Sequence, residues 1–400
     1  MKIAIFTETF LPIRNGVVTT IVNLAKGLAN RGHKIYIITH KYNKLNFSYP
    51  NVKVKFVKGV KSSFIYEDVK TAYPISIKTL NYIRKEKIDI IHFHSPWTVG
   101  LKAIFIAKLL DLPLVGTYHT LIGDPQNLNH IKLNNKFVRN NVWKYSNLYY
   151  NRCDIVTTPS EVIKKLLIKN GCKRKIKVIP NSIEIIKPDE KSASAIRKRY
   201  APNGPLLIHF GRIAYEKNIN YLLECFSLII KKIPTAKLIV LGFGPQIEDL
   251  KRKAIELNLE NNFSYLGGYE TEKLMKDGYC KASDVFLTTS KTETGCIVVL
   301  EALSQGLPCV GVNKYALPFL IKNNHTGFIV PSNDKKAFAK AVIKILKNKK
   351  LKDKFSKNAI EFAKDFETNV IVDKWEELFL SLIKKKNIKT KNILKKLIKI

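Results

Sequence analysis

Four side chains in the C-terminal half of the sequence are of types that could hold a phosphorylated ligand. Arg212 and Lys217 lie in the segment GRIAYEKN and could supply the positive charge and hydrogen-bond donors that a diphosphate needs. Glu293 and Glu301 lie in the segment KTETGCIVVLEALSQGLP, one in the loop before a predicted helix and the other about two turns inside it. Both carboxylates could accept hydrogen bonds from the hydroxyls of a ligand lying over the helix end. Ordinary surface charge is the alternative explanation for the two cations.

The start of the same predicted helix offers backbone donors. Amides at a helix N-terminus carry partial positive charge and bind anions. We expect the amides of five consecutive residues to face phosphate groups: Thr294, Gly295, Cys296, Ile297 and Val298. The glycine-rich turn LGFGP follows another predicted strand, but by itself this pattern is not specific.

The N-terminal half contains two further segments with chemical potential. In TFLPIRNGVVTT, Gly16 permits a tight turn before a predicted helix, which favours an anion or a sugar oxygen. In VGTYHTLIGD, His119 and Asp124 follow a predicted strand at its carboxyl end. A structural turn and a structural histidine are the alternatives.

Short apolar runs that alternate with helical patterns must position these residues. Apolar strands separated by helices indicate parallel sheets covered on both faces, so we predict an α/β protein with two Rossmann-like domains. Ligands bind such sheets at the carboxyl ends of the strands, where the residues above stand, and two facing domains would place the site in a cleft between them. The runs that predict strands are 2–6, 35–39, 52–57, 89–94, 112–119 and 154–159, then 206–211, 237–242, 263–267, 284–289 and 307–312. The main helical patterns are 21–28, 74–87, 98–110, 218–232, 245–257, 270–281, 297–305 and 334–347.

Length and composition agree with this organisation. The chain has 400 residues, 46% apolar and 25% charged, which predicts two or three domains and excludes a disordered chain, a collagen and a disulfide-rich miniprotein. The polar segment KPDEKSASAIRKRYAPNGP separates the two strand-rich blocks. We therefore predict an N-terminal domain at 1–187, a linker at 188–204 and a C-terminal domain at 205–366.

Neither a membrane span nor a metal site is expected from the sequence. No segment has the roughly 18 uninterrupted apolar residues of a span, and the first ten residues do not resemble a signal peptide. The six cysteines are scattered without a CxxC pair, which predicts a reduced cytoplasmic interior without a cysteine metal site. Lys and Arg number 69 against 32 Asp and Glu, a net charge of +37. This excess indicates either solvated Lys-rich surfaces or attraction to nucleic acid or a membrane.

Two segments could meet an anionic membrane. Residues 126–152 mix bases and aromatics, with apolar residues at helical spacing, as in a helix lying at a membrane surface. A core stripe with solvated lysines is the alternative. The end of the chain, 381–400, has eight lysines and no acid, and a frayed solvated terminus is the alternative there. The membrane contacts that we predict are Lys132, Lys136, Arg139, Trp143 and Lys144.

Together these motifs resemble the family 4 retaining glycosyltransferases of GT-B fold. The resemblance covers nearly the whole chain, and its most specific parts are GRIAYEKN and ETGCIVVLE, with VIPNSI and TTPSE in their expected places. FTETFLPIRNGVVTTI, TYHTLIGD and SKTETGCIVVLEALSQGLP are most similar to the diacylglycerol glucosyltransferases of that family. Residues 367–383 resemble the last GT-B helix, which crosses back to the first domain, and 384–400 would form a basic tail.

The resemblance implies a role for each candidate residue on the donor side. Arg212 and Lys217 would hold the diphosphate of a nucleotide sugar, with Glu293 on the sugar hydroxyls and Glu301 on the ribose. Gly16 would let the N-terminal loop approach donor and acceptor. Such enzymes need no bound divalent metal, so neither a metal nor another cofactor is expected. Positive charge and a helix end would stabilise the leaving diphosphate instead.

Further roles implied by the resemblance concern the acceptor and the hinge. His119 would contact the transferred sugar, Asp124 would position the acceptor or act as a base, and Asn181 would sit by the hinge. Relatives that act on lipids commonly have Gln-Gly where this chain has Gly295-Cys296, and often an acid where it has Gly123. The first departure bears on donor geometry and the second on acceptor identity.

The sequence thus predicts transfer of a hexose, with UDP-glucose as the first candidate donor, to a membrane lipid such as diacylglycerol. The protein would be cytoplasmic and peripheral on the inner face of the cell membrane. A soluble sugar or polysaccharide acceptor is the alternative. A non-enzymatic basic binder of membrane or nucleic acid is more distant, because no RNA-binding aromatic signature or zinc module is visible and no nucleic-acid partner is expected.

Overall fold

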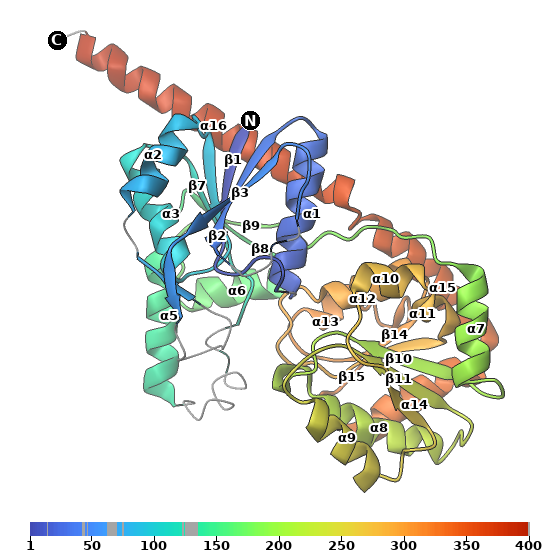
Figure 1. Ribbon diagram of the computed structural model, residues 1–400. Coiled ribbons are helices and arrows are strands. Elements are labelled where there is room, and N and C mark those ends of the chain that lie inside the picture. The colour runs from blue at the N-terminus through green and yellow to red at the C-terminus, as the bar shows by residue number, and fades with distance from the viewer. Residues whose placement is uncertain are drawn as a thin grey trace. The chain divides into compact units, whose positions relative to one another are not determined.

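The structure is a computed structural model, and it forms two compact units that are described separately (Figure 1). Unit 1 comprises Met1–Thr120, Asn135–Ser182 and Thr368–Ile400, and unit 2 comprises Leu121–Asn134 and Ile183–Glu367. The described residues are all those of the chain except 14, 42–44, 46, 62–69, 74–75, 122–123, 125–134 and 399–400.

Unit 1 is built on a seven-stranded parallel sheet of order β3-β2-β1-β6-β7-β8-β9. Its central strands are buried except at Lys2, the first residue of β1, which explains why they form nearly continuous apolar runs. The strands are β1 Lys2–Phe6, β2 Lys34–His40, β3 Val52–Val57, β6 Ile90–Phe93, β7 Leu114–Thr117, β8 Ile155–Thr158 and β9 Ile176–Val178, with an antiparallel pair β4 Gly59–Lys61 and β5 Lys70–Ala72. The helices are α1 Gly16–Asn30, α2 Ile77–Lys85, α3 Thr98–Leu109, α5 Lys136–Tyr150, α6 Glu161–Lys169 and α16 Thr368–Ile398.

The C-terminal helix α16, red in Figure 1, is part of the unit 1 core. Val372 lies so close to Gly27 of α1 that a Cβ at Gly27 would touch its side chain. Trp375 and Phe379 of α16 are buried, and Glu376 pairs with Arg31 at 2.8 Å. Helix α16 therefore completes the first unit, and it extends to Ile398, through most of the segment 384–400 that was expected to be a basic tail.

Unit 2 has a six-stranded parallel sheet of order β12-β11-β10-β13-β14-β15. The ends of the stretch Ile183–Glu367 lie together, because the Ile183 amide donates to the Phe366 carbonyl at 2.9 Å. The strands are β10 Leu206–Phe210, β11 Lys237–Leu241, β12 Phe263–Tyr265, β13 Val285–Thr288, β14 Cys309–Val312 and β15 Gly327–Val330. The helices are α7 Glu190–Tyr200, η1 Tyr215–Lys217, α8 Ile219–Ile230, α9 Ile247–Glu256, α10 Thr271–Lys276, α11 Tyr279–Ala282, α12 Ile297–Ser304, α13 Leu317–Leu320, α14 Lys335–Lys347 and α15 Lys349–Lys364.

The two parallel sheets confirm the predicted pair of Rossmann-like domains, and most predicted strands and helices are present. One helical prediction was wrong in its continuity: 270–281 forms α10 and α11, separated at Gly278, whose positive φ of 81° ends the helical path. The segment 188–204, expected as a linker, contains α7 and lies within unit 2.

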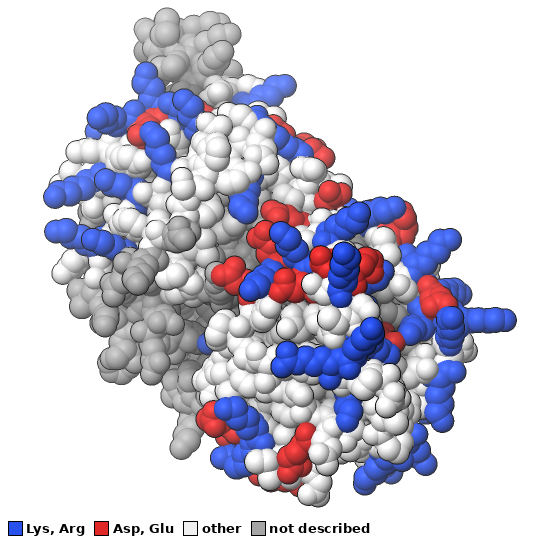
Figure 2. All heavy atoms as spheres, turned by 45° about the vertical axis from the view of Figure 1, so that its right-hand side comes forward, with Lys and Arg blue, Asp and Glu red and all other residues white. Residues whose placement is uncertain are grey.

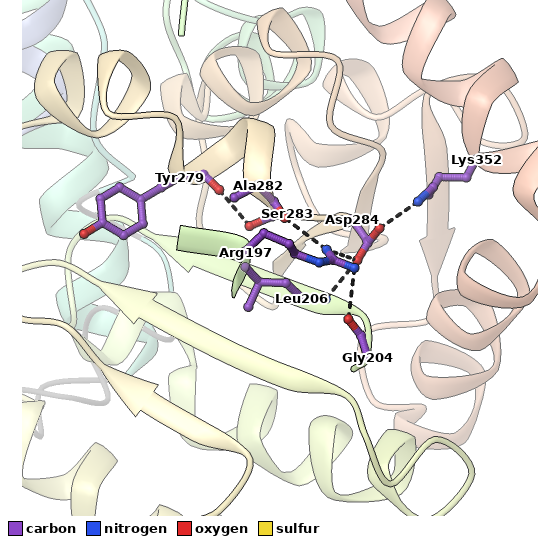
Figure 3. Close-up of polar contacts among 8 residues, drawn as sticks. All are labelled: Arg197, Gly204, Leu206, Tyr279, Ala282, Ser283, Asp284 and Lys352. Carbon is purple, nitrogen blue, oxygen red and sulfur yellow. Dashed lines mark hydrogen bonds and ion pairs between the residues drawn. The ribbon is translucent and has the colours of Figure 1, made fainter. Parts of the chain in front are cut away.

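A buried carboxylate explains why α7 belongs to unit 2. Asp284 precedes β13 and accepts hydrogen bonds from Arg197 of α7 at 2.6 Å, Lys352 of α15 at 2.7 Å and the Leu206 amide at 2.8 Å (Figure 3). Burial raises the pKa of Asp284, but its bonds to Lys352, Leu206 and Arg197 outweigh burial and lower it. A cavity of about 510 Å³ opens beside this cluster, at the amino ends of β10 and β13 and so away from the predicted site residues.

Figure 2 shows Lys and Arg side chains spread widely over the visible face, with Asp and Glu in fewer places. Among the described residues, no helix is long and apolar enough to cross a membrane.

Candidate active site

Two neighbouring strands of unit 2 bring Lys217 and Glu293 together. β10 and β13 pair in parallel, so the loops that follow their carboxyl ends are adjacent. The hydroxyl of Thr289 donates to the Asn218 carbonyl at 2.9 Å, and that of Ser290 donates to the Glu216 carbonyl at 3.0 Å. These bonds fix both loops, and the Lys217 ammonium forms an ion pair with Glu293.

The Lys217–Glu293 pair is largely shielded from water, with side-chain exposures of 21% and 11%. Burial lowers the pKa of Lys217, but the charge and hydrogen bond of Glu293, together with smaller contributions from Cys296 and Glu216, raise it overall. Burial raises the pKa of Glu293, but the charge and hydrogen bond of Lys217, together with Ser290 and Cys296, lower it overall. Both groups are therefore charged at neutral pH, one as a donor to an anion and the other as an acceptor of hydroxyl hydrogen bonds.

The other predicted donor-side residues lie around this pair in unit 2. The side chain of Arg212 is 46% exposed, and its guanidinium lies 3.9 Å from Glu216. Thr294, Gly295 and Cys296 are buried before α12, and Cys296 occupies its N-cap position without a side-chain capping bond. The Cys296 thiol, at the second of the two positions Gly295-Cys296, interacts with Glu293 and helps to lower the pKa of that carboxyl group. Ile297 and Val298 form the first turn of α12.

Glu301, one turn further along α12, has an unsatisfied carboxylate. Its Oε2 atom is buried and has no hydrogen-bond partner among the described residues. Burial raises the pKa of Glu301 to about 8. Because a buried polar atom without a partner is unfavourable, this carboxyl group is suited to a ligand hydroxyl.

The turn LGFGP closes against the loop that follows β10. The Gly211 amide donates to the Leu241 carbonyl at 3.0 Å, and the Ile213 amide donates to the Phe243 carbonyl at 2.8 Å. A Cβ at Gly242 would overlap the Gly211 carbonyl oxygen, so only glycine fits there. This turn positions the segment that carries Arg212.

In unit 1, a polar cluster missed from the sequence lies where β1 and β2 end. Glu8 accepts hydrogen bonds from His40 at 2.8 Å and from the Val99 amide at the start of α3. Burial raises the pKa of Glu8, although His40 and the Val99 amide oppose this. The position of Glu8 just after an apolar predicted strand was the sequence signal that could have identified it as a candidate site residue.

His119 follows β7 and belongs to a row of histidines in unit 1. Its Nε2 lies 2.8 Å from Nδ1 of His94, which follows β6, and the planes of the two rings differ by only 11°. The His94 ring also packs on His92, with centroids 4.0 Å apart. Burial lowers the pKa of His119 to about 4 and holds those of His94 and His92 well below their usual value. His94 was missed, although the alternation HFH was its signal.

Three further predicted residues lie in separate places. Gly16 is the first residue of α1, which Asn15 caps by accepting from the Val18 amide at 2.9 Å. Asn181 lies just before the chain enters unit 2 and accepts from the Thr20 hydroxyl at 3.2 Å. Asp124 clusters with unit 2, unlike His119, and accepts a hydrogen bond from the Tyr315 hydroxyl. Gly123 lies outside the described residues.

The predicted membrane segment forms α5 in its described part. Phe137, at the start of α5, is 76% exposed. The Trp143 ring instead stacks on Tyr118, with centroids 6.0 Å apart. Lys136 and Lys144 are exposed and Arg139 is half-buried, whereas Lys132 lies outside the described residues. The described residues contain no group of three or more His, Cys, Asp or Glu side chains that could hold a metal ion.

Comparison with known proteins identifies the family. Two family models match in succession, Glycosyltransferase Family 4 over residues 14–186 and Glycosyl transferases group 1 over residues 192–362. An alpha-monoglucosyldiacylglycerol synthase of Streptococcus pneumoniae is 30% identical over 82% of this chain and 74% of its own length. The chain belongs to the family 4 glycosyltransferases. A synthase of the same name from Acholeplasma laidlawii is 28% identical to this glycosyltransferase over 97% of the chain and 98% of the relative.

Solved structures confirm the GT-B fold of this glycosyltransferase. Sucrose-phosphate synthase from Thermosynechococcus elongatus matches with a TM-score of 0.75 and 19% identity, covering 96% of this chain and 99% of that one. Anabaena HepE in complex with UDP-glucose matches with a TM-score of 0.74 and 18% identity, covering 95% of this chain and all of that one. At these identities the likeness concerns the fold.

Proposed function

We propose that this glycosyltransferase transfers a hexose, with retention of anomeric configuration, from a nucleotide sugar to a membrane lipid such as diacylglycerol. UDP-glucose is the first candidate donor. The observation that carries the proposal is the similarity along almost the entire chain to an alpha-monoglucosyldiacylglycerol synthase, combined with the buried Lys217–Glu293 pair.

The donor would bind unit 2 at the carboxyl ends of β10 and β13. Lys217 and Arg212 would hold the diphosphate, and charged hydrogen bonds of this kind contribute about 1.5–3 kcal/mol each. Glu293 would accept hydrogen bonds from the sugar hydroxyls, and Glu301 would bond to the ribose. The amides before α12 would add fixed dipoles near the phosphates, so negative charge that develops on the leaving diphosphate would be stabilised without a divalent metal.

The chemical step would break the bond between the anomeric carbon and the diphosphate oxygen. The acceptor hydroxyl would attack from the same face, and a diphosphate oxygen would take its proton, so no protein nucleophile is assigned. His119 would contact the transferred sugar, and Asp124 would position the acceptor. Asn181 would lie at the hinge.

The acceptor side would depend on an anionic membrane surface. Exposed Phe137 beside Lys136 on α5 suits insertion among lipid headgroups. Lys384 and Lys385 on α16 are also exposed, and each base near such a surface contributes about 1 kcal/mol. This supports a peripheral location on the cytoplasmic face of the cell membrane.

A soluble acceptor is the second candidate function. The N-acetyl-alpha-D-glucosaminyl L-malate synthase of Bacillus anthracis is 24% identical over 92% of this chain and 94% of its own length. The name of that relative contains L-malate, a small soluble acid, so overall similarity is compatible with either class of acceptor.

A radiolabelled transfer assay tests both candidates. UDP-glucose, UDP-galactose, UDP-N-acetylglucosamine and GDP-mannose are offered with and without anionic vesicles containing diacylglycerol, and with EDTA. Label entering the organic phase supports the proposal, and transfer only to soluble acceptors contradicts the lipid assignment. Arg212→Ala should lower lipid labelling at least about tenfold, whereas Arg252→Ala, which changes an exposed arginine elsewhere in unit 2, should not. Loss of labelling in EDTA would contradict metal-independent transfer.

A further inference from the structure

The His94–His119 contact requires an unequal sharing of protons. Both rings are neutral at neutral pH because burial lowers their pKa values. A neutral imidazole carries one proton, so one ring must donate and the other accept across the 2.8 Å between His94 Nδ1 and His119 Nε2.

The far side of His94 decides the direction. Its Nε2 is buried and has no hydrogen-bond partner among the described residues. If His119 donated, His94 would carry its proton on Nε2, as a buried N–H without an acceptor. Such orphaned N–H groups are rare in folded proteins, and unsatisfied acceptors are less so. His94 Nδ1 must therefore donate, which leaves the His119 proton on Nδ1.

The surroundings of His94 hold it in this arrangement. Its backbone amide donates to the Phe6 carbonyl at 3.0 Å, one side of its ring packs on His92, and its ring is nearly parallel to that of the hydrogen-bonded His119. His92 directs its own Nε2 to the Thr117 hydroxyl at 2.6 Å, while its Nδ1 is buried without a partner. His92 therefore packs on the same row but makes no bond to His119, which makes it a matched control.

We propose that His94 is a positioning residue that keeps the His119 proton on Nδ1, so that His119 meets a bound sugar as a hydrogen-bond donor. The part that concerns the sugar rests on the proposed function, whereas the assignment of the proton does not. Sugar hydroxyls and ring oxygens accept hydrogen bonds, and a neutral Nδ1–H can bond to them without adding charge at the reacting centre.

Nitrogen NMR of the full-length protein tests the assignment without activity. Long-range ¹H–¹⁵N correlation on protein labelled in the histidine rings should show a protonated Nδ1 and a bare Nε2 for His119. A protonated Nε2 in the wild type would overturn the proposal, whether or not any variant folds. Comparison with the spectrum of His119→Gln assigns the signals.

Variants then separate positioning from structural support. His94→Leu should move the His119 proton to Nε2, whereas His94→Asn, whose amide can still donate, and His92→Leu should leave it on Nδ1. If the wild type transfers sugar, His94→Leu should lower kcat about 10- to 100-fold, as loss of a partner that orients a functional imidazole does elsewhere, and His94→Asn should restore most of it. An unchanged His119 spectrum in a folded His94→Leu protein would overturn the proposal. Absence of transfer by the wild type would contradict the proposed function. The NMR result would still decide whether His94 keeps the His119 proton on Nδ1.

Discussion

The burial of Glu301 can be tested quantitatively through the pH dependence of stability. Its ordinary pKa of 4.5 is raised to about 8 by burial, so the folded state keeps a proton that the unfolded state has already released between these values. Stability is therefore full below pH 4.5 and falls as the pH rises toward 8. The difference of 8 − 4.5, at about 1.36 kcal/mol per pKa unit, sets an upper limit of about 5 kcal/mol.

Glu301→Gln should abolish this loss, because the amide cannot ionise. Urea unfolding at pH 5 and pH 8 should show the variant close to wild type at pH 5 and several kcal/mol more stable at pH 8. Glu272→Gln, which changes an exposed glutamate of the same unit, should shift stability equally at both pH values. A wild-type to Glu301→Gln difference that is the same at pH 5 and pH 8 would refute the reasoning that burial holds this carboxyl group neutral.

Three further predictions follow from the contacts. Lys217→Ala leaves the Glu293 carboxylate buried without its cation and should lower the free energy of unfolding in urea by about 3–5 kcal/mol. The double variant Lys217→Met/Glu293→Gln should recover much of this loss, because it leaves no unpaired charge. Full stability of Lys217→Ala would contradict the charged pair. Phe137→Ser should weaken co-sedimentation with anionic vesicles about tenfold or more, given about 1.5–3 kcal/mol for burying the ring, whereas Phe243→Ser, which changes a ring that is 60% exposed in unit 2, should not. Equal binding by wild type and Phe137→Ser would contradict contact between α5 and the membrane surface. Gly242→Ala should destabilise the protein by about 1–3 kcal/mol more than Gly32→Ala, because both glycines have positive φ but only Gly242 abuts a backbone carbonyl. Equal decreases in Tm for the two variants would argue against that close approach.

The sequence was most informative where one physical requirement dominated. Strands buried on both faces must be largely apolar, so runs such as LLIHF and KLIVL predicted the sheets correctly. Loops after parallel strands meet at one edge, which is why Lys217 and Glu293 could be grouped before their ion pair was seen.

Features that depend on partners distant in sequence were beyond this reasoning. Helix α7 has a polar sequence typical of a linker, and its attachment depends on Arg197 meeting Asp284 87 residues away. His94 looked like part of a buried strand, and its bond to His119 depends on the register of β6 and β7. The Glu301 Oε2 atom is buried without a hydrogen-bond partner among the described residues, and this likewise depends on packing around α12 that no local sequence pattern predicts.

The joined ends of unit 2 bear on how such an enzyme can be rebuilt. The stretch Ile183–Glu367 starts and finishes at one β-bridge, while α16 returns the chain to the core of unit 1. The stretch is therefore inserted into unit 1 between two junctions that lie side by side. A segment of the same fold from another protein could replace it through only two adjacent peptide bonds. Recombination at those junctions can exchange the stretch Ile183–Glu367 between relatives and leave the histidine row and α16 of the recipient intact.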